Sequence, residues 1–148
     1  MADATRHTSS DALDFWVGEW TCTWDGGRGT NSITKELDDR VVVERFECLE
    51  PEPWTGSSVS VHQEQRGWRQ TWVDSTGNYW ALEGDPHPEG FSFSVAELDE
   101  DGREVVKRMV FFDIERDRFA WRWERSYDDG DTWETLWTID YRRATPPA

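Results

Sequence analysis

Glu44 is the side chain whose neighbours best suit it to acid–base chemistry. It alternates with Val42 and Phe46 in segment 40–50, a pattern typical of a strand with one apolar face. A carboxyl group buried on such a face has a raised pKa and is able to act as a general acid or base. The alternative is a salt bridge between Glu44 and a basic side chain of a neighbouring strand.

Asp74 is the second candidate carboxylate. It ends a run in which Trp68, Gln70, Trp72 and Asp74 share one face of an extended strand. Apolar walls with a few converging polar groups are typical of small-molecule pockets. The alternative is structural, because Asp74 precedes a Ser-Thr-Gly turn signal and an aspartate at that position caps turns.

Aromatic side chains at alternate positions supply the other candidate contacts. Segment 118–126 alternates Trp121 with Trp123, and segment 132–142 places Trp133 and Trp137 on one face. Such spacing is most typical of core packing, and in a hollow fold the same side chains also contact a ligand. The candidate ligand-binding residues are Phe46, Trp68, Gln70, Trp72, Trp80, Trp121, Trp123 and Trp137.

Histidine and the acidic clusters form no metal pattern in the sequence. His7 lies near the N-terminus, His87 lies in a proline-rich loop, and His62 shares a face with Ser58 and Ser60 that we expect to be solvated. No pair of histidines has the spacing of zinc ligands, and the acidic clusters lack the calcium-loop order. We therefore expect neither a metal nor a cofactor.

Charge excludes several classes of partner. The 148 residues carry a formal net charge of −15, with a pI near 4.5. Such a surface repels phosphate backbones and anionic lipid, so we expect no nucleic-acid or membrane partner, and a monomer or weak homodimer. No apolar run is long enough to span a bilayer and the N-terminus lacks a signal-peptide pattern, so the expected compartment is the cytoplasm. Cys22 and Cys48 are expected to be free thiols there.

Tryptophan replaces aliphatic residues in the expected core. Leu, Ile, Val and Phe make up only about 18% of the chain, a fraction that with high net charge is typical of disorder. The 11 tryptophans reverse that expectation, since each is able to bury roughly 150–250 Å². The chain is therefore expected to fold.

Turn signals recur about every 10–15 residues and predict consecutive antiparallel hairpins. A meander of such strands closes most simply into an up-and-down barrel, with a sandwich as the alternative. The fold class expected is all-β, with about ten strands near 18–25, 29–37, 40–50, 57–64, 68–75, 78–84, 91–98, 103–114, 118–126 and 132–142.

One short helix is expected before the first strand. Ser9, Ser10 or Asp11 would cap it, and the apolar stretch from Leu13 to Val17 would form its body. The expected organisation is a flexible N-terminus over 1–10, a single barrel domain over 11–143 and a flexible tail over 144–148.

Two short blocks at the ends of the barrel resemble the calycin superfamily, which includes lipocalins, fatty-acid-binding proteins and the ten-stranded nitrobindins. The first is G-x-W at Gly18 to Trp20, just after the helix, and the second is Tyr141-Arg142-Arg143 at the last strand. The resemblance implies a calycin-like barrel closed at one end by a cation–π contact between Trp20 and Arg142 (or Arg143). Nitrobindins bind haem through a histidine, but no histidine of this chain matches that ligand, so haem is the disfavoured alternative.

Two further blocks resemble a bacterial family of unknown function that also opens with F-x-x-G-x-W. Residues 67–77 carry its W-x-Q-x-W-x-D-x-x-G pattern, and residues 126–133 carry S-x-D-x-G-x-T-W. The second block also fits an Asp-box, a hairpin turn in which a carboxylate accepts backbone N–H bonds, and we interpret it as a capped turn. The resemblance implies a fold but supplies no activity.

Three functions remain open at this stage. The favoured one is binding of a small apolar or aromatic molecule in a Trp-lined barrel cavity. The alternative is a cofactor-independent cyclase or isomerase of a bacterial biosynthetic pathway, with Glu44 or Asp74 as its acid or base. A third is a protein-interaction module anchored by Trp54, which lies in a loop between Pro53 and Gly56.

Overall fold

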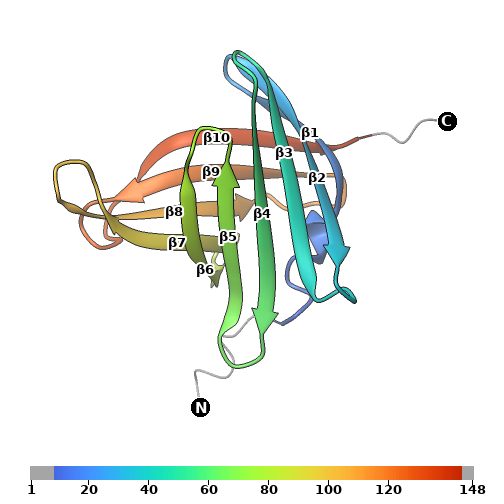
Figure 1. Ribbon diagram of the computed structural model, residues 1–148, viewed down its shortest axis with the longest axis horizontal. Helices are drawn as coiled ribbons and strands as arrows, with labels where there is room; N and C mark the ends of the chain where they lie inside the picture. Colours follow the sequence, from blue (N-terminus) through green and yellow to red (C-terminus); the bar gives the residue numbers. More distant parts are fainter. Residues whose placement is uncertain (1–8, 145–148) are drawn as a thin grey trace.

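Each strand pairs antiparallel with the next along the chain, and the last pairs with the first (Figure 1). The computed structural model describes residues 9–144, and the all-β, ten-stranded closed barrel expected from the sequence is confirmed. The strands are β1 (Gly18–Trp24), β2 (Gly27–Glu36), β3 (Val41–Glu50), β4 (Trp54–Gln63), β5 (Gly67–Asp74), β6 (Tyr79–His87), β7 (Gly90–Leu98), β8 (Glu104–Phe112), β9 (Arg118–Ser126) and β10 (Glu134–Arg143).

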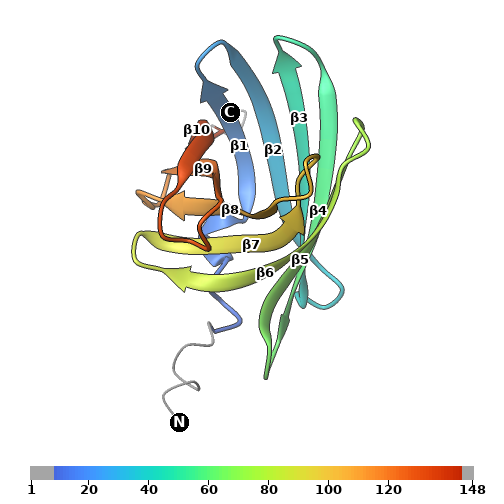
Figure 2. The same cartoon turned by 90° about the vertical axis from the view of Figure 1, so that its left-hand side faces the viewer.

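The barrel has two halves whose strands run in different directions. β2 to β5 run along the vertical of Figure 1, whereas β7 to β10 run across it. Figure 2, turned by 90°, again shows β6 and β7 crossing the line of β2 and β3. Side chains from both halves therefore face one shared lumen.

Strand alternation decides which residues enter that lumen. In β3 the buried residues are Val42, Glu44, Phe46 and Cys48, and the residues between them are more exposed. Three polar residues, Glu44 of β3 and Ser58 and Ser60 of β4, are buried at inward positions, so the lumen is partly polar.

The face of β4 differs from the expectation. Ser58 and Ser60 are fully buried, whereas Val59 between them is 49% exposed. The prediction of a solvated face is therefore wrong for Ser58 and Ser60, and His62 on the same face is half-buried. The reason is register: Ser58 pairs with Glu44 of β3, and that pairing fixes which face of β4 turns inward.

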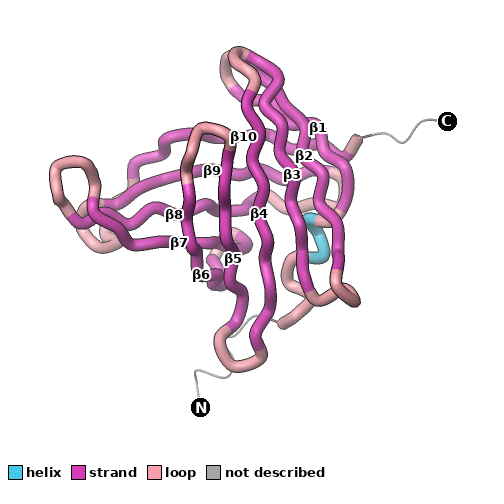
Figure 3. The backbone as a smooth tube through the Cα atoms, in the orientation of Figure 1, coloured by secondary structure: helices cyan, strands magenta, loops and turns pink. Residues whose placement is uncertain are grey.

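A short 3₁₀ turn, η2 (Asp14–Trp16), closes one end of the barrel. It is cyan in Figure 3 and lies at the same end as the β2–β3 turn. Leu13 and Trp16 are buried there, and Trp16 packs edge-on against Phe111. The expected helix is thus a single turn that begins after Leu13, with no side-chain cap.

A contact between Trp20 and Arg143 holds the η2 end of the barrel closed. The Arg143 guanidinium lies 4.3 Å from the centre of the Trp20 ring and donates to the Val17 carbonyl at 3.0 Å. Gly18 has φ +140°, and a Cβ there would lie 2.3 Å from the arginine, which explains the glycine of G-x-W. Arg142 as the stacking partner is wrong, because Trp20 pairs with Arg143 and Arg142 instead points to Asp140.

The domain boundaries stay a prediction. The expected flexible segments 1–10 and 144–148 lie almost wholly outside the described residues. His87, expected in a proline-rich loop, instead ends β6 and pairs with Gly90 of β7. Within residues 9–144, no helix has the length and apolar character needed to cross a membrane.

Candidate functional site

A cavity of about 240 Å³ lies in the lumen, on the far side of the core from η2. Eight aromatic side chains line it, and the seven that are tryptophan or phenylalanine are called here the aromatic wall: Phe46, Trp54, Trp72, Trp80, Trp121, Trp123 and Trp137. The other lining residues are Glu44, Asp74, Thr76, Asn78, Met109, Ile139 and Tyr141. Asp74, Thr76 and Asn78 belong to the β5–β6 turn, which places the cavity mouth at that end of the barrel.

The aromatic wall is held by ring-to-ring contacts across the lumen. The Trp137 ring centre lies 5.4 Å from that of Trp121 and 6.2 Å from that of Trp54. Trp72 packs where Gly56 leaves space, since a Cβ on Gly56 would lie 2.4 Å from the indole. These ring faces are fixed before any ligand arrives.

Tryptophan burial differs between the two ends of the barrel. Trp16 and Trp20 at the closed end are fully buried. The six tryptophans of the aromatic wall pack against the core and yet are each only half-buried. Their apolar surface therefore faces space that a ligand is able to fill.

Glu44 supplies a carboxyl group to this cavity, and only 7% of the residue is exposed. Its Oε1 accepts from the Ser58 hydroxyl and its Oε2 from the Asn31 amide, both at 2.7 Å. Burial raises the pKa of Glu44, although these two hydrogen bonds lower it in part. The salt bridge considered for Glu44 is absent among the described residues.

Tyr141 and Cys22 extend the polar group around Glu44. The Asn31 amide also donates to the Tyr141 hydroxyl at 3.0 Å, and that hydroxyl hydrogen-bonds Cys22. Burial raises the pKa of the Tyr141 phenol and of the Cys22 thiol, so both stay neutral. Asn31 Oδ1 is buried and has no hydrogen-bond partner within residues 9–144.

Asp74 has the contacts of a turn cap. Its carboxylate accepts from the Thr76 hydroxyl and backbone, from the Asn78 side chain and backbone, and from the Trp72 indole. Desolvation raises its pKa, but the hydrogen bonds from Thr76, Trp72 and Asn78 outweigh it and lower the pKa to about 2. Asp74 therefore stays ionised, and one oxygen fixes the Trp72 indole at the cavity mouth.

Most of the candidate ligand-binding residues line the cavity, but two of them do not. Trp68 and Gln70 point inward and lie outside the cavity lining. The Trp68 indole donates to the Ser9 carbonyl at 3.2 Å, and the Gln70 amide donates to Ser60 at 2.9 Å. Both therefore belong to the packed part of the lumen.

Reasoning from the sequence missed several residues of the site. Trp54, expected as an exposed loop anchor, begins β4 and has its ring centre 5.2 Å from Phe46 inside the lumen. Asn31, a partner of Glu44, lies in a segment without an apolar pattern, and Ser58, the other partner, alternates with Val59 and Val61 on the opposite face. Their only signal is small polar residues at alternate positions beside an apolar strand, which sequence reasoning assigns to the solvent side.

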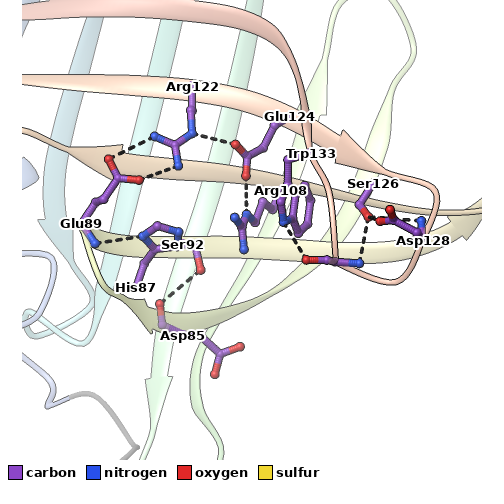
Figure 4. Close-up of polar contacts among 11 residues, drawn as sticks. Asp85, His87, Glu89, Ser92, Arg108, Arg122, Glu124, Ser126, Asp128 and Trp133 are labelled. Atoms are coloured by element: carbon purple, nitrogen blue, oxygen red, sulfur yellow. Dashed lines mark hydrogen bonds and ion pairs between the residues drawn. The ribbon is translucent and has the colours of Figure 1, made fainter.

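A second polar cluster lies on the outer face of β8 and β9 (Figure 4). Glu124 is buried there between Arg108 and Arg122, and Arg122 also pairs with Glu89 at 2.8 Å. The Arg108 guanidinium lies 3.7 Å from the centre of the Trp133 ring. A bulge between Thr135 and Trp137 shifts the register of β10, so the expectation that Trp133 shares the face of Trp137 is wrong.

The Asp-box turn adjoins this cluster and is structural, as predicted. Asp128 accepts from the Thr132 backbone at 2.8 Å, and Ser126 Oγ accepts from the Gly130 backbone at 2.8 Å. The Ser126 hydroxyl also donates to Asp128 (Figure 4). Hydrogen bonds from Thr132, then from Ser126, lower the pKa of Asp128 to about 2. In the outer cluster, Glu124 and Glu89 are paired with Arg108 and Arg122. The candidate site is therefore the lumen.

The chain matches no family model, and a search of curated proteins finds no match. Within residues 9–144 no group of three or more His, Cys, Asp or Glu side chains is arranged to hold a metal ion. His7 lies outside the described residues, and neither His62 nor His87 lines the cavity.

Proposed function

We propose that this protein binds one small, largely apolar or aromatic molecule in the lumen. The observation that carries the proposal is the set of six half-buried tryptophans of the aromatic wall, around a cavity of about 240 Å³. A ligand that covers these faces gains about 25 cal/mol per Å² of apolar surface removed from water. Because the rings already contact one another, little side-chain ordering opposes binding.

Isothermal titration with 2-naphthylmethanol, a neutral bicyclic probe, tests the proposal. The wild type is expected to bind one equivalent. Met109→Trp, which fills the cavity, is expected to lose binding, whereas Val59→Trp, which adds the same ring to the outer face, is expected to retain it. Thermal unfolding shows that each variant is folded. Equal binding by all three proteins, or binding by none, contradicts the proposal.

Glu44 supports the enzyme alternative, a cofactor-independent cyclase or isomerase. A buried carboxyl group with a raised pKa, lining a cavity, suits proton transfer to a bound substrate. Native mass spectrometry of the purified protein gives the mass of any retained molecule. Turnover of that molecule by the wild type, lost in Glu44→Gln while binding remains, would favour catalysis over binding alone.

We infer membership of the calycin superfamily as a second proposal. The ten-stranded closed barrel and the Gly18–Trp20–Arg143 arrangement support it. The bacterial family resembled at 67–77 and 126–133 stays a prediction. The cytoplasm also stays the expected compartment, supported by the free thiols of Cys22 and Cys48, as does a monomer or weak homodimer.

A further inference from the structure

The charges that face the cavity all have one sign. Glu44 and Asp74 are its acidic lining residues, and no lysine, arginine or histidine lines it within the described part of the chain. Asp74 at the mouth stays ionised because its pKa is lowered to about 2. The protein as a whole carries −15. A cation is therefore drawn to the mouth, and an anion is repelled.

Glu44 has capacity for another partner. A carboxylate accepts about four hydrogen bonds, and each oxygen of Glu44 takes one from the described residues, from Ser58 and from Asn31. Asn31 Oδ1 beside it takes none and is buried. The polar group around Glu44 therefore offers hydrogen-bond acceptors without matching donors. An anionic or carbonyl ligand needs donors, so this group does not suit it.

The aromatic wall suits a cation for an independent reason. The faces of indole rings carry negative electrostatic potential and attract ammonium groups within about 6 Å, tryptophan being the strongest attractor. Six of the seven wall residues are tryptophan. Because these rings are fixed by contacts with one another, the attraction needs no rearrangement.

We propose that the lumen selects an aromatic or aliphatic amine, whose ammonium group pairs with Glu44 while its apolar body lies against the aromatic wall. This inference rests on the proposed function and adds the chemical class of the ligand. Burial of an unpaired carboxylate is costly, so a cationic partner restores the charge of Glu44 and supplies the missing donors.

Three probes with the same bicyclic body test the charge: 2-naphthylmethylamine, 2-naphthylmethanol and 2-naphthoate. In isothermal titration near neutral pH, the wild type is expected to bind the amine at least about tenfold more tightly than the alcohol, and the carboxylate most weakly. Glu44→Gln is expected to lose most of this preference, and the part that remains comes from the indole faces and from Asp74. Glu47→Gln removes the same charge from an exposed position of β3 and is expected to keep the preference.

The outcomes separate the two proposals. Binding of the alcohol with no preference for the amine in the wild type overturns the amine inference and leaves the proposed function standing. Absence of binding by all three probes overturns the proposed function as well. Because the first comparison needs only the wild type, it holds even where Glu44→Gln does not fold. Loss of the preference in Glu47→Gln as well would assign it to net charge and overturn the role of Glu44.

Discussion

Ser58 lies directly opposite Glu44 in the pairing of β4 with β3, and its hydroxyl donates to Glu44 Oε1 at 2.7 Å. Together with Asn31 on the other side, it holds a carboxyl group inside an aromatic lumen. Ionising a buried carboxyl group of this kind costs free energy. This cost should appear in the free energy of unfolding of the protein.

The stability contributed by Glu44 is expected to fall as pH rises. Burial raises its folded-state pKa above the ordinary 4.5, so the folded protein binds this proton more tightly than the unfolded chain does. The contribution is complete below 4.5 and is lost as pH rises through the folded-state value. Tyr141 and Cys22 nearby both have raised pKa values and keep their protons in this range.

Urea denaturation of the wild type and Glu44→Gln, from pH 4.5 towards neutrality, measures this effect. The free energy of unfolding of the wild type is expected to decline relative to that of Glu44→Gln. Glu47→Gln, on the same strand and exposed, corrects for the loss of one negative charge. A difference between wild type and Glu44→Gln that does not change with pH would contradict the burial of an ionisable Glu44.

Asp74 is expected to act through structure and not through chemistry. Asp74→Asn should lower the free energy of unfolding by about 1 kcal/mol near neutral pH, a modest amount because the carboxylate is partly exposed. This stability is present above the ordinary pKa of 3.8 and is lost as pH falls towards about 2. Affinity for 2-naphthylmethanol should change by less than about threefold, since Asp74 only positions Trp72.

Asp101→Asn, in the exposed β7–β8 turn, is the matched control for Asp74 and is expected to leave both quantities unchanged. Abolished binding in Asp74→Asn, with the fold retained, would show instead that this carboxylate contacts the ligand.

The two adjacent arginines of β10 are expected to behave differently. Arg143→Ala removes the stack on Trp20 and the bond to the Val17 carbonyl, and should cost about 2 kcal/mol in the free energy of unfolding. Arg142→Ala removes an exposed ion pair with Asp140 and should cost less than about 0.5 kcal/mol. Thermal or urea unfolding of both variants gives the comparison, and equal losses would contradict the assignment of the barrel closure to Arg143.

The fold was predictable because turn chemistry and strand alternation act locally. Turn signals give the hairpins, and sequential hairpins without crossover helices leave a barrel as the simplest closure. Glu44 and the Trp72 face were predictable for the same reason, since apolar or aromatic neighbours at period two mark an inward face.

Other parts of the site depend on distant register and were not predictable. Ser58 is drawn inward by pairing with Glu44 against the apolar pattern of β4. Trp133 leaves the face of Trp137 because one residue is inserted at a bulge. Trp54 turns inward because its ring packs against the rings of Phe46 and Trp137, which lie on other strands. These contacts join distant segments, so the sequence of any one segment does not reveal them.

Nuclear magnetic resonance of the indole N–H groups tests the central claim most directly, because the 11 tryptophans report from every part of the molecule. On titration with 2-naphthylmethanol, the indole signals of Trp54, Trp121 and Trp137 are expected to shift through ring currents of the bound probe. Those of Trp16 at the closed end and Trp133 on the outer face should stay in place. Shifts confined to Trp133, or no shift at saturating probe, would contradict binding in the lumen.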